Sequence, residues 1–369
     1  MVVARSLQMR LDRGQPTWRL TILVIALLYW SSPAWAAVDI QGIDISHWQG
    51  TISSSTWSSI KNAGYSFVFM KATQGNSYVD PEFTNNITRS TAKGLLAGPY
   101  HFCELDTGYG DPTDPVTEAN HFLATIMPYY QTGSYLPPVA DVEQFPSGLT
   151  TAQLKTLTSA WVQAFSDRIY DALGVRPIVY NSLSKANSYY TSSVAGSHEL
   201  WLAQWKGTGT TSPPVASDTP LWGIWQFWQW SNGSDSIAQA NLVPGISGNV
   251  DRDVYYGTQT QLNGLAVHSL VGDFNRDGQV DGCDYIGWRK TKGQTVQIYS
   301  GADANGDGTI GTADYTMLTA HFGQTSGSGA GLGALLGDRS AVPEPSSIGL
   351  MLGTLSLLPM VARRRATLS

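Results

Sequence analysis

Two carboxylates, Asp141 and Glu143, stand two residues apart directly after the apolar run 138–140. If this run is a strand, both side chains lie on one face, with backbone positions about 6.6 Å apart. Neighbouring carboxylates cannot both ionise freely, so the pKa of one rises and that group can act as a general acid. Glycosidic cleavage needs such an acid and a second carboxylate that supports the cationic transition state. Taken alone, the pattern fits a solvated or salt-bridged strand end equally well.

A second polar cluster ends the segment 42–50 (GIDISHWQG). The segment begins with the composition of a strand, and Asp44, Ser46, His47 and Trp48 fall within five residues of it. A single polar residue at a strand end usually anchors a loop. Four such residues within five positions favour a binding site.

Tryptophan is concentrated between residues 201 and 230, where six of the 13 tryptophans of the chain fall. Exposed indole rings stack on sugar faces, whereas buried rings fill the core. We expect about two of these six rings, Trp205 among them, to face a ligand and the others to pack.

The elements that must position these residues alternate along residues 38–257. Several of the strand-like runs are almost wholly apolar, as strands buried on both faces should be. Helical periodicity separates the early runs, as in 150–173, whereas the last gaps are rich in Gly, Ser, Thr and Pro. The pattern predicts an α/β, TIM-like barrel whose later crossovers have lost their helices, with its chemistry at the C-terminal ends of the strands. The eight expected strands are 40–46, 66–72, 95–102, 138–143, 177–181, 199–205, 223–230 and 248–254.

Residues 269–324 contain a repeat with a period of 30 and the spacing of a calcium-binding loop. Oxygen donors take loop positions 1, 3, 5, 7, 9 and 12 around a glycine at position 6, with a backbone carbonyl at position 7. We predict two Ca²⁺ sites in this module. The first has Asp273, Asn275, Asp277, Gln279, Asp281 and Asp284, and the second has Asp303, Asn305, Asp307, Thr309 and Asp314. The apolar residues expected to pack in this small module are Tyr285, Ile286, Trp288, Tyr315, Met317, Leu318 and Phe322.

Charged residues make up only 14% of the 369 residues, and the formal net charge is −6. An acidic surface repels a phosphate backbone, which argues against a nucleic-acid partner. An apolar content of 42% excludes wholesale disorder. Cys103 and Cys283 fall in different modules, so we expect no disulfide between them.

Both ends of the chain have the composition of targeting segments. Residues 1–36 combine arginines, a short apolar run and an Ala-x-Ala site, which predicts a signal peptide cleaved after Ala36. A retained membrane anchor is the alternative. A Gly/Ser-rich linker, 325–342, leads to a tail, 343–369, with a Pro-Glu-Pro motif, an apolar helix and an arginine cluster. This order is a stop-transfer pattern, and an ordinary membrane tail is the alternative reading.

Seven motifs in residues 37–260 resemble glycoside hydrolase family 25, the Chalaropsis-type lysozymes or N-acetylmuramidases. They are 42–50, 71–75 (KATQG), 98–102 (GPYHF), 138–143 (PVADVE), 201–205 (WLAQW), 228–231 (WQWS) and 245–253 (GISGNVDRD). The resemblance implies a barrel of five β/α units and three further strands, and catalysis without a cofactor. It also implies hydrolysis of the β-1,4 bond from N-acetylmuramic acid to N-acetylglucosamine in peptidoglycan.

The resemblance also implies roles for individual residues. Glu143 matches the general acid/base. Asp141 matches its partner, which in a substrate-assisted mechanism holds the N-acetyl group as that group attacks the anomeric carbon. Asp44 and Asp251 match two further acidic residues of the cleft. The expected substrate-binding residues are Tyr100, Gln74, Trp205 and Gln229.

The chain departs from the family pattern at several positions outside the four carboxylates. Gln74 stands where the family usually has Glu, which keeps hydrogen bonding and loses the charge. Asn249 and Asp253 replace the commoner Asp and Asn on either side of Asp251, and Trp230 replaces a Tyr.

Two further resemblances concern residues 269–369. The calcium repeat resembles a type I dockerin, which implies a cohesin-like partner, with a calcium-stabilised spacer as the alternative. The tail resembles a PEP-CTERM sorting signal, which implies a secreted or cell-envelope protein with membrane or surface attachment. For the barrel, the rival hypotheses are a catalytically silent peptidoglycan-binding module and the same barrel acting on another amino-sugar polymer.

Overall fold

The computed structural model describes residues 40–105, 110–111 and 113–325. The predicted signal peptide, the sorting signal and all of the predicted linker except Thr325 lie outside these residues. Among the helices of the described part of the chain, none is long and apolar enough to cross a membrane. The two predicted apolar targeting helices are outside that search.

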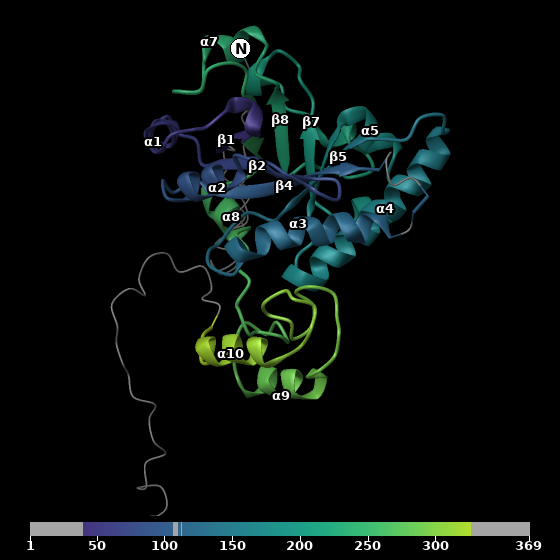
Figure 1. Cartoon of the computed structure of the whole chain (residues 1–369). Coiled ribbons are helices and arrows are strands. Elements are labelled where there is room, and N and C mark those ends of the chain that lie inside the picture. The colour runs from purple at the N-terminus through teal and green to yellow at the C-terminus, as the bar shows by residue number, and fades with distance from the viewer. Residues whose placement is uncertain (1–39, 106–109, 112, 326–369) are drawn as a thin grey trace, which may run out of the picture. The chain divides into compact units, whose positions relative to one another are not determined.

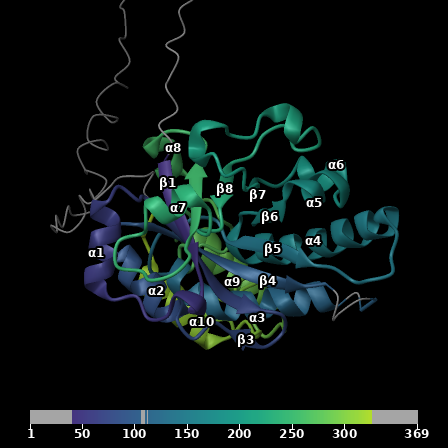
Figure 2. The ribbon, with the colours of Figure 1, turned by 90° about the horizontal axis from the view of Figure 1, so that it is seen from above.

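Eight strands close into a barrel, as the sequence predicted (Figures 1 and 2). The neighbouring barrel strands β1, β2, β4, β5, β6, β7 and β8 run parallel, and the last strand, β9, runs antiparallel to both β8 and β1. The first and last residues of the barrel sequence are paired, since Ile40 on β1 lies opposite Tyr255 on β9. A short strand, β3 (Tyr78–Val79), pairs with the end of β2. The barrel strands are β1 (Ile40–Ile45), β2 (Phe67–Gln74), β4 (Leu96–Glu104), β5 (Val139–Gln144), β6 (Ile178–Ser182), β7 (Leu200–Ala203), β8 (Phe227–Ser231) and β9 (Asp251–Tyr255).

Helices of nine residues or more follow the first four barrel strands, whereas only short helices or 3₁₀ turns follow β6, β7, β8 and β9. The predicted closed barrel is confirmed, and the division into five β/α units and three further strands stays a prediction. Between β7 and β8 the chain makes only 3₁₀ turns, at 209–211 and 216–218. The helices around the barrel are α1 (Ser54–Asn62), α2 (Phe83–Thr91), α3 (Asp114–Tyr130), α4 (Thr151–Leu173), α5 (Leu183–Ser188), α6 (Ser192–Ala195), α7 (Ser236–Ala240) and α8 (Gln259–Gly264).

Local sequence explains the bounds of the longest helix, α4. The Thr150 hydroxyl accepts from the backbone N–H of Gln153, whose side chain bonds back to Thr150, a capping box. Gly174 ends the helix in a left-handed conformation, with φ of 73°. Between these ends, Trp161 and Phe165 are among the side chains that α4 buries, and α4 packs beside α3 (Figures 1 and 2).

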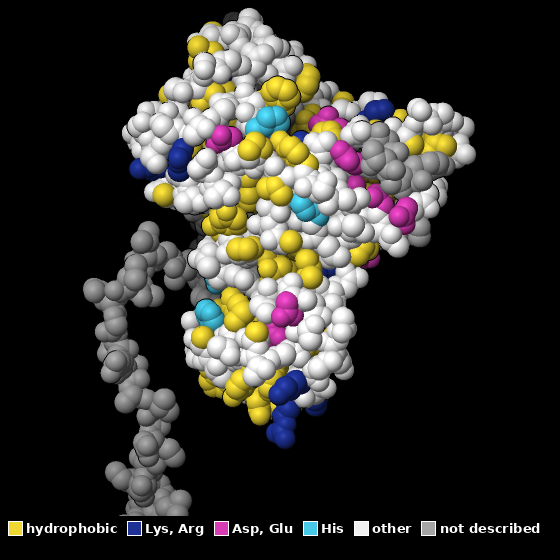
Figure 3. All heavy atoms as spheres, in the orientation of Figure 1, with side chains coloured by type: hydrophobic (Ala, Val, Ile, Leu, Met, Phe, Trp, Pro, Cys, Tyr) yellow, Lys and Arg dark blue, Asp and Glu magenta, His cyan; other side chains and the backbone are white. Residues whose placement is uncertain are grey.

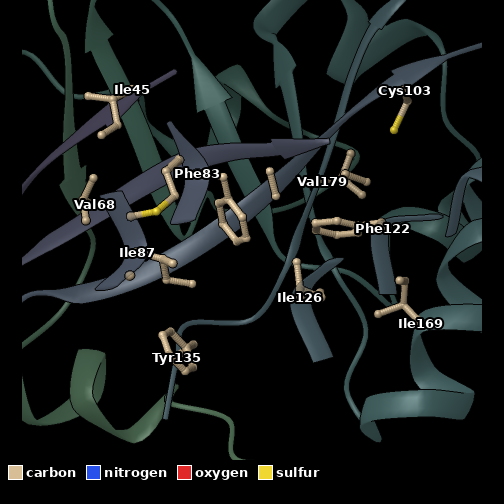
Figure 4. Packing of buried hydrophobic residues seen from close by; sticks show 14 of the residues in the cluster. Ile45, Val68, Phe83, Ile87, Cys103, Phe122, Ile126, Tyr135, Ile169 and Val179 are labelled. Carbon is tan, nitrogen blue, oxygen red and sulfur yellow. The ribbon is translucent and has the colours of Figure 1, made fainter. Parts of the chain in front are cut away.

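Aromatic side chains fill the interior of the barrel. The Phe67 and Phe227 rings meet edge to face with centroids 5.2 Å apart, and Phe69 stacks on Trp201 at 4.4 Å. A Cβ on Gly42 would lie 2.3 Å from the Phe67 ring, so this packing of rings inside the barrel requires a glycine at position 42. A separate apolar cluster lies between strands and helices, with Phe122, Ile126 and others shown in Figure 4. Each large buried side chain contributes about 1.5–3 kcal/mol of hydrophobic stabilisation.

The repeat region folds as two loops, each followed by a helix: α9 (Gly282–Thr291) and α10 (Thr312–His321). Val280 of the first loop exchanges backbone hydrogen bonds with residues 323–324, and Ile310 of the second does so with residues 293–294. Its small core includes Trp288, Ala302 and Ile310. Two residues that we expected to pack are instead exposed, Ile286 by 51% and Phe322 by 57%. Ile286 lies on α9 and Phe322 directly follows α10, on surfaces that the two-helix module is too small to cover.

The loops of the repeat region contact α3 and α4 of the barrel. Gln131 donates to the backbone oxygen of Ala304 at 2.8 Å. The guanidinium of Arg168, a buried side chain, bonds to Asn120 and to the backbone oxygen of Ile298. These contacts place the repeat module against the outside of the barrel.

Candidate active site

The four predicted acidic residues converge on one end of the barrel. Asp44 ends β1, and Asp141 and Glu143 lie near the end of β5. Asp251 begins β9, and because β9 is antiparallel, its first residue reaches the same end as the last residues of its neighbours. Asp44 and Asp251 are register partners across β1 and β9. Residues more than 200 positions apart are thereby brought together.

These carboxylates line a pocket of about 180 Å³. Tyr100 and Gln229, two of the predicted substrate-binding residues, also line it. The full lining is Asp44, Ser46, Trp48, Lys71, Tyr100, Phe102, Asp141, Glu143, Tyr180, Trp201, Gln229 and Asp251.

Asp141 and Glu143 differ in their access to solvent. The Asp141 side chain is buried, with 7% exposure, whereas Glu143 is exposed at the mouth. Burial, followed by the nearby charge of Glu143, raises the pKa of Asp141 well above its usual range. The surrounding cleft walls also raise the pKa of Glu143, while its hydrogen bond with Asp141 opposes that rise. The pair therefore titrates as a unit that retains a proton at a higher pH than free carboxyl groups do.

Gln229 organises the opposite side of the pocket. Its Nε2 donates to Oδ2 of Asp44 at 2.8 Å and, more weakly, to Oδ2 of Asp251 at 3.4 Å. Its Oε1 accepts from the Tyr180 hydroxyl and from Nε1 of Trp205, each at 2.9 Å. One amide thus links side chains from β1, β6, β9 and the segment after β7.

Burial is the main cause of the raised pKa values of Asp44 and Asp251. Desolvation, followed by the charges of Asp251 and Asp253, raises the pKa of Asp44 well above its usual range. Desolvation raises the pKa of Asp251 to about 6, with the hydrogen bond to Asp44 opposing the rise. Asp253, which departs from the family pattern, is fully buried and accepts from Nε1 of Trp201 at 2.8 Å.

Two predicted substrate-binding residues, Gln74 and Trp205, are not among the side chains that line the pocket. Gln74 bonds to Lys71 and Glu104 instead. Trp205 is 54% exposed and bonds to Gln229. Among the other tryptophans of the 201–230 cluster, Trp201, Trp225, Trp228 and Trp230 are buried, as expected of packing residues.

Several lining residues were not predicted from the sequence, including Lys71, Phe102 and Tyr180. Strand register could have indicated two of them, because Asp141 lies opposite Phe102 on β4 and Tyr180 on β6. Trp48 is 83% exposed beside the pocket, on a 3₁₀ turn that the Ser46 side chain caps. Its ring lies 4.7 Å from that of His47, which pairs with Asp80 at 3.0 Å.

The predicted metal ligands gather in two equivalent loops. Asp284 and Asp314 are fully buried, and each accepts three backbone N–H groups from its own loop. The donors are Phe274, Asn275 and Asp281 in the first loop and Ala304, Asn305 and Gly311 in the second. Burial raises the pKa of Asp273 and of Asp303, and neighbouring carboxylates raise both further. Asp281 also caps α9 through the backbone N–H of Cys283. This donor set, carboxylate and amide oxygens with several negative charges, is of the kind that Ca²⁺ prefers.

A third group of metal-capable side chains lies between strand β4 and helix α3. His101, Cys103 and Glu118 are fully buried with ligand atoms within 4.8 Å of one another. Their bonds are already satisfied within the protein, since His101 bonds to Glu118 and to Thr73 at 2.7 Å each. Both cysteines of the chain are free, Cys103 buried and Cys283 exposed.

Comparison with known proteins places the barrel in a family. The model of glycosyl hydrolases family 25 matches residues 43–237, more than half of the chain. Lysozyme M1 of Streptomyces globisporus is 34% identical over 235 residues, which cover 62% of this chain and 71% of the relative. The N,O-diacetylmuramidase of a Chalaropsis species is 30% identical over 220 residues, covering 58% of this chain and 96% of the relative.

A solved lysozyme structure also matches the barrel. The bacterial lysozyme of Streptomyces coelicolor shares 32% identity, with a TM-score of 0.50, over 61% of this chain and 95% of that chain. The family match contains Asp44, Asp141 and Glu143, while Asp251 lies beyond it and joins the site through β9. The chain belongs to glycosyl hydrolase family 25 and is a glycoside hydrolase.

Proposed function

We propose that this enzyme is a muramidase that hydrolyses the β-1,4 bond from N-acetylmuramic acid to N-acetylglucosamine in peptidoglycan. The observation that carries the proposal is the convergence of Asp141 and Glu143 with Asp44 and Asp251 on one pocket. The relatives named lysozyme and N,O-diacetylmuramidase support the choice of substrate.

In the proposed reaction, Glu143 protonates the leaving oxygen as the glycosidic bond breaks. Its position at the solvent-exposed mouth suits a group that exchanges protons with water. The carbonyl oxygen of the substrate N-acetyl group forms the new bond to the anomeric carbon, and Asp141 holds that group by its N–H. Water then attacks the same carbon, the bond from that carbon to the N-acetyl oxygen breaks, and the water proton passes to Glu143, which restores the enzyme. Asp44 and Asp251 complete the acidic wall that favours positive charge on the sugar.

Digestion of purified peptidoglycan tests this proposal. The products are reduced with borohydride, and mass spectrometry identifies the sugar at each new reducing end. Muramic acid at these ends supports the assignment, whereas glucosamine at these ends refutes it. A Glu143→Gln preparation of the same purity is the control, because it removes the proton donor and keeps the shape of the side chain.

We propose in addition that residues 269–324 bind two Ca²⁺ ions and form a dockerin-like module. Buried, mutually repelling carboxylates in two equivalent loops support this view. In each loop, the side chains at positions 1, 3, 5 and 12 would hold the ion, which would neutralise their charges. A cohesin-like protein is the partner that this module would recognise.

For localisation, we propose export with cleavage after Ala36, followed by sorting at the Pro343-Glu344-Pro345 motif. The result would be a secreted or cell-envelope enzyme. Mass spectrometry of the protein recovered from its host tests both points, since the mature chain should begin at Ala37. An N-terminus at Met1 would refute the cleavage.

A further inference from the structure

The catalytic pocket contains one cation among many acids. Of the described residues that line it, Lys71 alone is positively charged, and four are carboxylic acids. Lys71 lies on β2, whereas Asp141 and Glu143 lie on β5, so the barrel itself brings the three groups to the same cavity. The reaction as described above gives Lys71 no role.

The ammonium group of Lys71 is held in place by its neighbours. Nζ donates to Oε1 of Gln74 at 2.5 Å. It also lies 4.7 Å from the ring centroid of Phe102 and 5.4 Å from that of Tyr78. An amide oxygen and two aromatic rings attract a cation without cancelling its charge, unlike a carboxylate. Burial lowers the pKa of Lys71, and the charges of Asp141, Asp80, Glu104 and Glu143 oppose that change and favour its ammonium form.

Gln74 is itself fixed by a carboxylate. Its Nε2 donates to Oε1 of Glu104 at 2.6 Å, which sets the direction of the amide and points its oxygen at Lys71. The Glu104 side chain occupies the space next to Gly75, where a Cβ would lie 2.4 Å from Oε2. The φ of Gly75 is +51°, a conformation that favours glycine. A glutamate at position 74 would place a carboxylate against both Lys71 and Glu104.

We propose that Lys71 is a positioning residue for the hydrolysis, whose charge keeps one carboxylate of the Asp141–Glu143 pair ionised, while Gln74 holds Lys71 without neutralising it. This inference rests on the proposed muramidase activity. The glutamine at position 74, a departure from the family pattern, is on this view the residue that leaves the charge of Lys71 available.

The electrostatics of the pocket agree with this geometry. Burial raises the pKa of Asp141, and the charge of Lys71 opposes the rise in both Asp141 and Glu143. The other titratable groups near the pair cannot take this role. They are uncharged with pKa values raised by burial, or are acids: Tyr100, Cys103 and Glu104 on β4, Tyr180 on β6, Tyr190 after α5, Asp80 after β3, Asp44 on β1 and Asp251 on β9.

The charge of Lys71 determines the direction in which the acidic limb of the pH profile should move. Without the charge of Lys71, burial raises the pKa of the pair further, so the ionised carboxylate appears only at higher pH. The acidic limb of the pH profile of kcat/KM should therefore move to higher pH in Lys71→Met. The shift should be on the order of one pH unit. At pH values on the acidic limb, kcat/KM should therefore fall about tenfold, while at higher pH it should change little.

The experiment measures kcat/KM on purified peptidoglycan between pH 3 and pH 9 for the full chain and its variants. Lys71→Arg keeps the charge and should restore the native limb. Gln74→Glu should move the limb in the same direction as Lys71→Met, because a carboxylate then neutralises Lys71. Lys155→Met, which removes a lysine from the exposed face of α4, is the matched control and should leave the profile unchanged.

Each outcome decides the question. A folded Lys71→Met enzyme with an unmoved acidic limb overturns the proposal, and so does a loss of activity that is equal at every pH, which would indicate substrate binding instead. If Lys71→Met does not fold, the limb of Gln74→Glu decides alone. A native enzyme that releases no muramic acid ends refutes the proposed function itself, and is recognised before any variant is compared.

Discussion

Replacing Gln229 with leucine tests whether one amide holds the acidic side of the pocket together. Leucine has a similar volume and no hydrogen-bonding groups, so the packing changes little while the four contacts of the amide are lost. Asp44, a buried carboxylate, loses a donor at 2.8 Å, which costs about 1.5–3 kcal/mol for a charged group. The buried Tyr180 hydroxyl loses its acceptor, which costs about 1 kcal/mol. Trp205 is half exposed and regains its bond from water.

The expected loss in the free energy of unfolding is therefore about 3 kcal/mol when Asp44 is ionised. With a urea m-value of about 3 kcal/mol/M, the midpoint of urea unfolding should then fall by about 1 M. Because burial raises the pKa of Asp44 well above its usual range, the loss should grow as pH rises and Asp44 ionises. Gln259→Leu is the matched control, since that glutamine is exposed on α8 and bonds only to Asn263 among the contacts described for its side chain. Equal midpoints for the two variants would refute the structural role of Gln229.

Three further predictions concern the acid, the pH dependence and the metal. Glu143→Gln should lower peptidoglycan hydrolysis about 100-fold or more with an unchanged unfolding midpoint, because the proton donor is lost; near-native turnover by the folded variant would contradict the assignment. Asp251 has a folded pKa of about 6 against an ordinary value of 3.8, so its contribution to stability is present at low pH and is lost as pH rises through that window. Asp251→Asn should accordingly raise the unfolding midpoint at pH 8 relative to the native chain and leave it nearly unchanged at pH 3.5; a lower midpoint at pH 8 would show that the charged form is stabilised instead. A chelator such as EGTA should expose residues 269–324 of the full chain to limited proteolysis, with protection restored by excess Ca²⁺ and hydrolysis by the barrel unchanged; equal resistance with and without chelator would contradict the calcium sites.

Local spacing was sufficient to predict the barrel and the place of Asp141 and Glu143 on one strand, whereas Asp251 was expected only from the family resemblance. The carboxylates at 141 and 143 needed only the two-residue period of a strand, and the loss of late helices followed from loops rich in Gly, Ser, Thr and Pro. The surface is as poor in charge as the composition indicated, and Figure 3 shows charged side chains scattered among uncharged ones on one face.

Contacts between distant strands could not be predicted from such spacing. Gln229 was expected to bind substrate, but no sequence pattern indicated that its amide contacts side chains from three other strands. In the same way, Gln74 could be recognised as a departure from the family pattern, while its link from Lys71 to Glu104 depends on the register between β2 and β4. The exposure of side chains in the repeat module could not be predicted either. Ile286 and Leu318 are both aliphatic, but the packing of the two short helices buries Leu318 and leaves Ile286 exposed.

The reversed direction of β9 has a consequence for how accessory parts can be added to this enzyme. Because β9 runs against β1, the first and last residues of the barrel, Ile40 and Tyr255, lie side by side, at the end opposite Asp44 and Asp251. Both attachment points for extra sequence are therefore remote from the substrate. A polymer as long as a glycan strand can cross the mouth of the barrel without meeting either junction. Modules at the two ends can be exchanged, lengthened or lost during evolution, or in protein engineering, while the catalytic face remains open.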